Sequence, residues 1–447
     1  MTAPAAERAT AARALKRVVV DRRTTDQTLT DPSPLVQELV LGSLRYYRSL
    51  STQVDRALSR PLREKDQEIK FLMIVGVYQL HHLRIPGHAA IFETVAACRR
   101  LGRPWAKGLV NAVLRRCADE PIERSSEHPA WLEEALSREY GDRAGELMAA
   151  NNLRAPMALR INRQRVGVDA YLELLDAAGI ASRPPRAEAQ GGNGANPSAA
   201  TLASGPALGP GPETRVLNSA VPAKTLPGFA AGLVAVQDAG AQFAAGLLSD
   251  GGPTVRLLDA CAAPGGKLFH LVESRPEITA LALDEHAGRV AQLQAQAERL
   301  GHLAVAIRQA DASSLDWWDG VPFDQVLLDA PCTGTGTLRR HPDIKVLRRA
   351  EDLPALTDLQ RRLLGNLWHV LQPGGTLLYC TCSILAAEND DVVAHFLAQH
   401  SDARAEAFAL TSGRPTRHGW QLLPTNPDTD GFYYARLRKA AAQGSGS

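Results

Sequence analysis

The sequence has 447 residues, 45% of them hydrophobic and 22% charged, an ordinary composition for a chain of two or three globular domains. Its longest apolar runs are far too short to span a bilayer, and its N-terminus lacks a signal-peptide pattern, so we expect a cytoplasmic protein without membrane contact. The six cysteines have no framework spacing, and no Cys/His cluster has zinc spacing. We therefore expect reduced thiols and no bound metal.

The net charge of +2 conceals an asymmetry along the chain. Residues 1–118 carry 20 Lys and Arg against 10 Asp and Glu, a balance of +10, so the remaining residues carry −8. A basic front part fits a polyanionic partner such as RNA. A solvated helical surface has the same charge pattern, and charge alone does not separate the two readings.

The front part of the chain shows helical periodicity and no strand pattern. Pro, Gly or Asp-Pro breaks separate six segments with apolar residues at three- and four-residue spacing. These segments are 11–20, 35–49, 50–59, 65–82, 89–101 and 105–117. They predict a compact all-α domain over residues 1–125.

Basic residues cluster along these helices and between them. Arginine suits phosphate because its planar guanidinium can bond two oxygens at once. Two stretches, LVLGSLRYY at 39–47 and KGLVNAVLRR at 107–116, resemble the NusB-like RNA-binding domain. The resemblance implies RNA contact, for which the candidate residues are Arg22, Arg23, Arg99, Arg100, Arg103, Lys107, Arg115 and Arg116.

A small α/β connecting module is predicted over residues 126–228. A helical stretch from Pro129 leads to a strand signal at 158–162 and a helix at 168–178. Between Pro184 and Pro212, 12 of 29 residues are Gly or Pro, so we expect a disordered insertion at 184–212. A flexible tail is expected at 441–447.

From residue 229 to 440 strands and helices alternate, as in a doubly wound sheet. The first strand, at 232–238, is followed by a helix at 239–248. Further strands are expected at 254–258, 278–283, 305–309, 325–328, 375–381 and 431–437. Helices are expected at 288–300, 356–370 and 388–398. This region is the predicted catalytic domain.

A glycine loop follows the strand at 254–258. Asp259 ends the strand, small residues turn the chain, and a helical run begins near Lys267, which is the strand, loop and helix order of a nucleotide-type site. Gly265 and Gly266 allow a ligand to approach the backbone, and Asp259 is an acceptor for a cationic amine. A simple structural turn is the alternative. The loop lacks G-x-G-x-x-G spacing, which disfavours a nicotinamide enzyme.

Two further acids end successive strands. Asp284 is placed to bond ribose hydroxyls, and Asp311 to accept from an adenine amine, although each acid alone is as expected for a helix cap. The set resembles the S-adenosylmethionine site of class I methyltransferases, which implies a Rossmann-like domain with a mixed, mostly parallel seven-stranded sheet. The implied cofactor residues are Asp259, Cys261, Ala262, Ala263, Pro264, Gly265, Gly266, Lys267, Asp284, Arg289, Asp311, Asp329 and Pro331.

Two later strands each deliver a cysteine to the same sheet edge. The segments DAPCTGTG at 329–336 and TCS at 381–383 resemble those of RNA (cytosine-5)-methyltransferases. With the NusB-like front part, the chain resembles the bacterial 16S ribosomal RNA methyltransferase B family. A cysteine is needed because cytosine C5 is a poor nucleophile until a thiolate adds at C6, and the base must be unstacked to be reached.

The resemblance implies that Cys382 is the nucleophile and that Cys332 helps to release the product. The competing assignment makes Cys332 the nucleophile, as in DNA cytosine-5 enzymes with a Pro-Cys motif. Asp329 is expected to bond the cytosine at N3, and Lys267 to reach the base or a phosphate. Cys380, where the family usually has a small residue, is read as packing or as an auxiliary thiol.

The leading hypothesis is a monomeric enzyme that methylates C5 of a cytosine in 16S ribosomal RNA, or in its small-subunit precursor, through a covalent adduct at C6. The rival from another class is a non-catalytic RNA-binding or antitermination-type factor. The retained Cys332, Cys382 and Asp329 argue against that rival.

Overall fold

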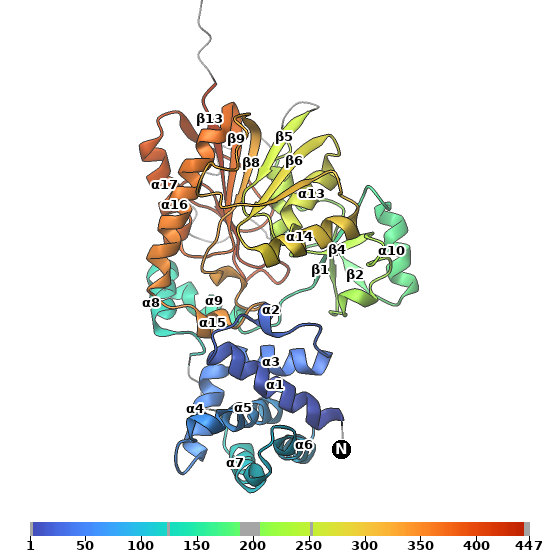
Figure 1. Ribbon diagram of the computed structural model, residues 1–447, viewed down its shortest axis with the longest axis vertical. Helices are drawn as coiled ribbons and strands as arrows, with labels where there is room; N and C mark the ends of the chain where they lie inside the picture. The colour runs from blue at the N-terminus through green and yellow to red at the C-terminus, as the bar shows by residue number, and fades with distance from the viewer. Residues whose placement is uncertain (1–2, 123–125, 188–205, 251–253, 442–447) are drawn as a thin grey trace, which may run out of the picture. The chain divides into compact units, whose positions relative to one another are not determined.

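The computed structural model describes residues 3–122, 126–187, 206–250 and 254–441 (Figure 1). The chain forms two compact units. The N-terminal unit comprises Met1–Arg154 and Leu338–Ala350, and the sheet unit comprises Ala155–Thr337 and Glu351–Ser447. The predicted three-domain boundaries remain a prediction.

Two predicted flexible segments are placed only in part. Most of the predicted insertion, 188–205, and the tail from 442 onward lie outside the described residues. Of the insertion's flanks, Leu208 donates its backbone N–H to the carbonyl of Ala409 at 2.8 Å and forms an isolated bridge with Leu410. That flank is therefore held against the sheet unit.

The N-terminal unit is helical, as predicted. Its helices are α1 (Ala3–Val19), α2 (Thr25–Thr28), α3 (Pro34–Arg45), α4 (Tyr47–Ala57), α5 (Gln67–His82), α6 (Gly87–Arg100), α7 (Lys107–Asp119), α8 (Ala130–Tyr140), α9 (Ala144–Ala150) and α15 (Ile344–Leu347). Every residue from Phe71 to Gln79 is buried, so α5 is the central helix of the core, packed by α1, α3, α6 and α7. Across the described ranges, no helix is both long and apolar enough to cross a membrane.

A late segment of the chain completes this helical unit. Helix α15 packs Val346 and Leu347 against the helical core. Asp343 accepts hydrogen bonds from the backbone N–H and the hydroxyl of Thr25, at 3.0 and 3.1 Å. Lys345 donates to the carbonyl of Arg45 at 3.2 Å. The sequence pattern did not indicate this, because a four-residue helix carries no periodicity.

A four-stranded antiparallel sheet begins the sheet unit. Its order is β2-β3-β1-β4, and its helix α10 spans Val168–Ala177. The strands are β1 (Ala158–Ile161), β2 (Ser182–Arg183), β3 (Thr214–Leu217) and β4 (Val234–Val236). The predicted strands at 158–162 and 232–238 are confirmed, but β4 pairs with β1 and so belongs to this small sheet rather than to the larger one.

The larger sheet has nine strands in the order β11-β12-β13-β9-β8-β5-β6-β7, with β10 paired to β13. Strands β5 to β9 are parallel, and β13 enters antiparallel beside β9. The strands are β5 (Val255–Asp259), β6 (Ile278–Asp284), β7 (Ala306–Gln309), β8 (Phe323–Asp329), β9 (Leu371–Thr381), β10 (Ala403–Glu406), β11 (Arg414–Pro415), β12 (Trp420–Gln421) and β13 (Tyr433–Lys439).

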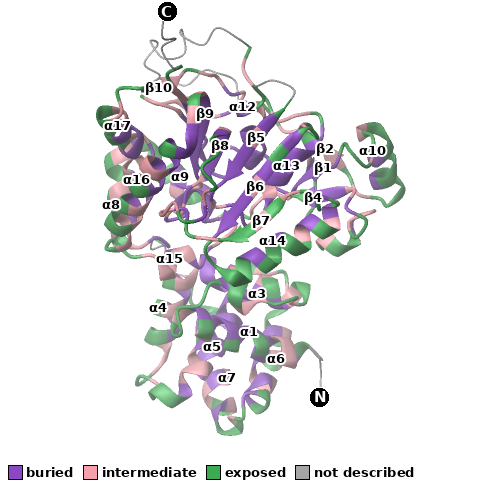
Figure 2. Ribbon diagram, turned by 45° about the horizontal axis from the view of Figure 1, so that its top comes forward, coloured by how far each residue is buried: buried purple, intermediate pink, exposed green. Residues whose placement is uncertain are grey.

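Helices cover both faces of this sheet, because alternate residues of each strand point to opposite sides. Leu257 of β5 packs with α12 (Phe243–Leu247), α13 (Gly266–Ser274) and α14 (Ala287–Leu300). Its neighbour Leu258 packs with α16 (Asp352–Val370) and α17 (Asp390–Gln399). Figure 2 shows the central strands buried and the outer faces of the helices exposed.

The predicted fold class, a NusB-like helical part followed by a mixed, mostly parallel Rossmann-like sheet, is confirmed. The expected number of seven strands is wrong, since the described residues contribute nine strands to this sheet. The six strands located from sequence are all present. Strands β11 and β12 were missed because they have only two residues each, and β10 was missed because its sequence, ARAE, has no large apolar residue.

Candidate active site

The glycine loop connects β5 to α13 and requires glycine at one position. Gly265 has a φ of 98°, a left-handed conformation that L side chains rarely adopt. Its N–H donates to the carbonyl of Ala262 at 2.7 Å, and a Cβ there would collide with the ring of Phe269. The loop is therefore a specific tight turn at the carboxyl end of β5.

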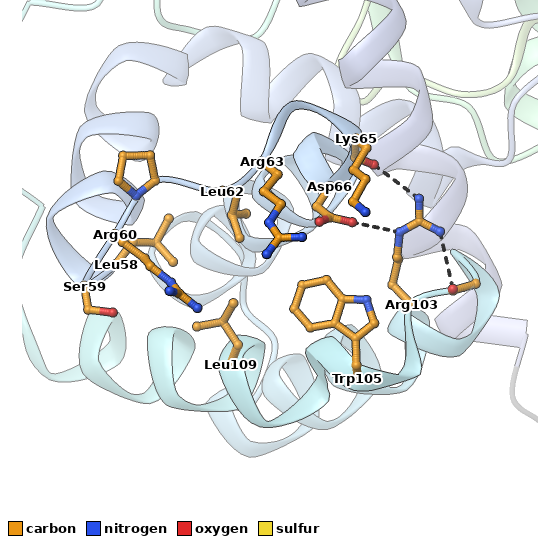
Figure 3. Close-up of a pocket in the computed structure, with 12 residues that line it drawn as sticks. Leu58, Ser59, Arg60, Leu62, Arg63, Lys65, Asp66, Arg103, Trp105 and Leu109 are labelled. Atoms are coloured by element: carbon orange, nitrogen blue, oxygen red, sulfur yellow. Dashed lines mark hydrogen bonds and ion pairs between the residues drawn. The ribbon is translucent and has the colours of Figure 1, made fainter.

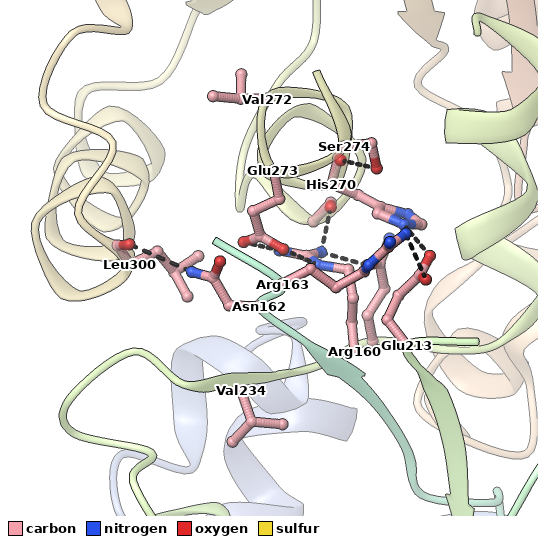
Figure 4. A network of polar contacts seen from close by, with 12 residues as sticks. Arg160, Asn162, Arg163, Glu213, Val234, His270, Val272, Glu273, Ser274 and Leu300 are labelled. Carbon is pink, nitrogen blue, oxygen red and sulfur yellow. Dashed lines mark hydrogen bonds and ion pairs between the residues drawn. The ribbon is translucent and has the colours of Figure 1, made fainter. Parts of the chain in front are cut away.

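Arg160 of β1 joins this loop and α13 to the small sheet, and Figure 4 shows it in a network of polar contacts with Glu273. Its guanidinium is fully buried and bonds both carboxylate oxygens of Glu273 at 2.8 Å, while Nη1 donates to the carbonyl of Gly266 at 2.6 Å. Burial alone would raise the pKa of Glu273, but Arg160 and His302 outweigh it and the pKa lies below its usual value. The small sheet thus fixes both ends of α13 by charged hydrogen bonds.

A pocket opens at the carboxyl ends of the parallel strands. Its lining comprises Ala260, Cys261, Ala263, Asp284, Glu285, Arg289, Ala310, Asp311, Ala312, Asp329, Ala330, Pro331, Cys332, Leu359, Leu363 and Cys382. Asp284, Asp311 and Asp329 follow or end β6, β7 and β8 and lie together in the lining, whereas Asp259, the first of the three acids expected at the donor site, does not; their part in donor binding remains a prediction.

Among the acids of the lining, Asp284 is buried and has one carboxylate oxygen that can still accept a hydrogen bond from a ligand. It is buried, and its Oδ1 accepts from the backbone N–H of His286 at 3.1 Å. Within the described residues its Oδ2 accepts no hydrogen bond, although Nη2 of Arg289 lies 3.2 Å away. A buried acceptor with spare capacity fits a hydroxyl-bearing ligand in the pocket.

Asp259 lies behind the pocket rather than in its lining. It is 1% exposed, and its Oδ1 has no hydrogen-bond partner among the described residues. Burial, with Asp329 nearby, raises the pKa of Asp259 to about 8. At neutral pH the acid is therefore largely protonated, unlike the carboxylate expected to meet a cationic amine.

Lys267 and Asp329 form an ion pair beside the pocket. Nζ of Lys267 lies 2.5 Å from Oδ2 of Asp329 and 5.2 Å from the centre of the Phe432 ring. Burial would lower the pKa of Lys267, but Asp329 and other acidic groups outweigh it and hold the pKa well above its usual value. The thiol of Cys380 contacts Asp329 Oδ1 at 3.5 Å. Asp329 is thereby fixed by two neighbours.

The two predicted cysteines meet at the pocket. Cys332 follows β8, Cys382 follows β9, and their sulfur atoms are 3.4 Å apart. The hydrogen bond to Cys382, together with burial, raises the pKa of Cys332 well above its usual value. Cys332 therefore holds its proton at neutral pH.

The loops that carry these cysteines are tied together by Glu388. This fully buried carboxylate accepts from the N–H of Thr333 at 2.7 Å and from the hydroxyls of Thr333 and Ser383 at 2.5 Å. The N–H of Gly336 also donates to the carbonyl of Cys382 at 2.9 Å. The sulfur–sulfur distance is therefore set by a rigid network.

Three family models match successive parts of the chain. Residues 5–119 match the NusB family, and residues 128–191 match a ferredoxin-like domain of RsmF/B-like methyltransferases. Residues 250–438 match the 16S rRNA methyltransferase RsmB/F model.

Whole-length relatives agree with these matches. Ribosomal RNA small subunit methyltransferase B of Pseudomonas syringae is 42% identical over 92% of this chain and 90% of its own length. The protein of the same name from Xanthomonas campestris is 39% identical over 98% of each chain. The chain belongs to the ribosomal RNA small subunit methyltransferase B family. The crystal structure of PH0851 has the same fold, with a TM-score of 0.78, 21% identity, and coverage of 98% of this chain and 99% of that one.

Membership of the methyltransferase B family makes the chain a methyltransferase and implies S-adenosylmethionine as its donor. Family membership also excludes the two alternatives considered from the sequence, a nicotinamide-dependent enzyme and a non-catalytic RNA-binding factor. In this family member the pocket lining contains Cys261, Ala263, Asp284, Arg289, Asp311, Asp329, Pro331, Cys332 and Cys382. The other predicted residues lie outside the lining, namely Asp259, Ala262, Pro264, Gly265, Gly266 and Lys267. Among the described residues, no three metal-ligating side chains gather in one place.

The predicted RNA-binding arginines of this methyltransferase B family member are partly engaged in internal contacts. Arg22 donates to the carbonyl of Leu347, and Arg103 pairs with Asp66 at 3.1 Å. Arg116 pairs with Glu120, also at 3.1 Å. Their role in RNA contact remains a prediction.

Arg160 and Glu388 were missed by the sequence reasoning. Arg160 carried a signal, since a charged residue inside the apolar strand ALRI needs a buried partner. Glu388 carried none beyond its position six residues after Cys382, because its partners come from two separate loops.

Proposed function

We propose that this enzyme transfers a methyl group from S-adenosylmethionine to C5 of a cytosine in 16S ribosomal RNA, through a transient bond between Cys382 and C6. The observation that carries the proposal is the 3.4 Å contact of the Cys332 and Cys382 sulfurs at a pocket lined by strand-end acids. The names of the relatives supply the RNA substrate.

The residues at the pocket fit the methyl donor. The buried Oδ2 of Asp284, which accepts no hydrogen bond from a described residue although it lies beside Arg289, suits a ribose hydroxyl, and Asp311 on the lining suits an amine of adenine. Cys261 and Ala263 of the glycine loop lie in the lining and suit the rest of the donor. When bound, the donor supplies an electrophilic methyl group on a sulfonium.

The protein groups divide the reaction into steps. The Cys382 thiolate adds to C6, and the electron pair of the C5–C6 double bond moves toward C5, which becomes nucleophilic. Asp329, held by Lys267, shares a proton at N3 and favours the addition. After methyl transfer, the Cys332 thiol passes its proton to solvent water, and the thiolate so formed takes the proton from C5. The double bond re-forms, and the carbon–sulfur bond to Cys382 breaks.

The two cysteines predict opposite mutant behaviour. Cys382→Ala abolishes methylation of small-subunit ribosomal RNA because no C6 adduct forms, while titration calorimetry shows donor binding retained. Cys332→Ala allows addition but not release, so a protein–RNA adduct accumulates as a band that resists denaturant. Cys98→Ala is the control, since it removes a buried thiol of the helical core that is not in the pocket lining, and it leaves both steps in place.

Three outcomes contradict the proposal in different ways. Turnover by Cys382→Ala refutes the nucleophile. An adduct in Cys382→Ala but not in Cys332→Ala assigns the nucleophile to Cys332. Active wild-type enzyme whose product shows no 5-methylcytosine when the RNA is mapped refutes the target atom.

A further inference from the structure

A second pocket lies in the N-terminal unit, on residues that the catalytic chemistry does not use (Figure 3). It lies between the chain that follows α4 and the turn that precedes α7. Its lining comprises Leu58, Ser59, Arg60, Pro61, Leu62, Arg63, Lys65, Asp66, Gly102, Arg103, Trp105 and Leu109. Its volume of about 1030 Å³ is at the upper end for ligand pockets and exceeds what a lone ion needs.

The charge of this pocket is strongly positive. Its lining has four cationic side chains and one acid, Asp66, which is buried and already paired with Arg103. The guanidinium groups of Arg60 and Arg63 are exposed, and they make no hydrogen bond or ion pair to any described residue. Unpaired guanidinium groups on a concave surface fit phosphate oxygens.

An aromatic ring stands at the same pocket. Trp105 is 56% exposed, although a side chain of this size is usually well covered in a folded protein. The 3-10 turn Pro104–Ala106 presents it, anchored by buried Ala106 and by the bond from the Arg103 N–H to the Cys98 carbonyl at 2.9 Å. The Trp105 indole is thus exposed while its backbone is held in place, so a planar aromatic group can stack on it.

Flat aromatic rings flanked by unpaired arginines are the combination that recognises unstacked bases in single-stranded nucleic acid. Figure 3 shows Trp105 and the guanidinium groups of Arg60 and Arg63 on the same pocket, with Leu62 and Leu109 as apolar lining. A base pair inside a helix offers no free face for stacking. The arrangement therefore favours an unpaired nucleotide over duplex RNA.

We propose that this pocket binds an unpaired nucleotide of a single-stranded RNA segment, with the base stacked on Trp105 and neighbouring phosphates bonded by Arg60 and Arg63. The proposal rests on the proposed RNA substrate and adds a second contact with it, outside the catalytic pocket. The contact increases affinity for the RNA and takes no part in the chemistry.

The test uses the full-length protein and a short fluorescent single-stranded RNA of mixed sequence, followed by anisotropy. Trp105→Ala weakens binding by roughly 5- to 150-fold, since a stacked base contributes about 1–3 kcal/mol, whereas Trp105→Phe retains most of the affinity. Arg60→Gln and Arg63→Gln each lower the slope of log affinity against log salt by about 0.7.

Matched controls come from the same unit. Phe92 is 66% exposed and Arg84 is exposed, and both lie outside the pocket, so Phe92→Ala and Arg84→Gln leave binding at the wild-type level. Circular dichroism melting of each variant verifies folding. With ribosomal RNA as substrate, Trp105→Ala raises KM, and kcat is unchanged.

The failures are distinguishable. If wild-type protein methylates ribosomal RNA but Trp105→Ala binds the oligonucleotide as tightly as wild type, the pocket has another occupant and this inference is overturned alone. Competition by duplex RNA as effective as by single-stranded RNA also overturns it. If wild-type protein neither binds nor methylates RNA, the proposed function fails, and this inference fails with it.

Discussion

At the scale of single residues, Asp259 shows how the position of an acid changes its role. From sequence it is the first acid of the donor site, yet it lies under the pocket with Oδ1 unpaired among the described residues. A buried carboxyl without a cation in contact prefers its neutral form, and its pKa rises from 3.8 to about 8. The residue therefore links stability to pH.

The sign of this linkage follows from the raised pKa. Between about pH 4 and pH 8 the folded protein keeps a proton that the unfolded chain has lost, so stability falls as pH rises through this interval. Asp259→Asn removes the effect, on the order of a few kcal/mol. Calorimetry without ligand should show a smaller loss of melting temperature from pH 5 to pH 8 than in wild type. Glu298→Gln, an exposed acid on α14, should keep the wild-type profile, and an unchanged profile in Asp259→Asn would contradict the assignment.

At the scale of elements, the loop that carries Cys332 and the loop that carries Cys382 are held together as one structural unit. They follow neighbouring parallel strands, β8 and β9, whose register pairs Asp329 with Cys380. Glu388 then joins the loops beyond the strand ends through Thr333 and Ser383. Glu388 therefore holds the Cys332 and Cys382 sulfurs in position relative to each other. Their position matters because a small displacement of a catalytic group lowers the reaction rate strongly.

Replacing Glu388 by Gln is expected to lower kcat by about 10- to 100-fold with donor affinity nearly unchanged. The amide replaces one carboxylate oxygen by a donor, so Thr333 and Ser383 lose a shared charged acceptor. Glu388→Ala should add a loss of about 1–3 kcal/mol in stability from unpaired buried groups. Steady-state kinetics and melting measure the two effects. Asp391→Asn, at an exposed acid of the following helix α17, is the control, and wild-type kcat in Glu388→Gln would contradict a positioning role.

At the scale of the whole molecule, the sequence predicts what is local and misses what is distant. The cysteine motifs, the strand-end acids and the six longer strands of the large sheet each have a signal within about ten residues. Arg160, Glu388 and the segment Leu338–Ala350 depend on partners far away in the chain. A motif can mark such a residue as unusual, but only the fold supplies its partner.

The discontinuous N-terminal unit can be tested in isolation. A fragment of residues 1–154 fused through a Gly/Ser linker to residues 338–350 should melt at a higher temperature than 1–154 alone, because Val346 and Leu347 cover the helical core. Asp343→Ala in the fusion should lose part of the gain with its two bonds to Thr25. Circular dichroism melting measures both. Equal melting of all three proteins would show that the segment adds nothing to this unit.

Because the N-terminal unit is built from two separate parts of the chain, it cannot complete its fold early in synthesis. Most domains can fold while later parts of the chain are still being synthesised. Here Thr25 bonds Asp343, and Arg45 bonds Lys345. Neither hydrogen bond can form until residues after 337 have been translated. The helical unit, which is the first part of the chain to leave the ribosome, therefore stays incomplete until strands β5, β6, β7 and β8 of the large sheet have been translated.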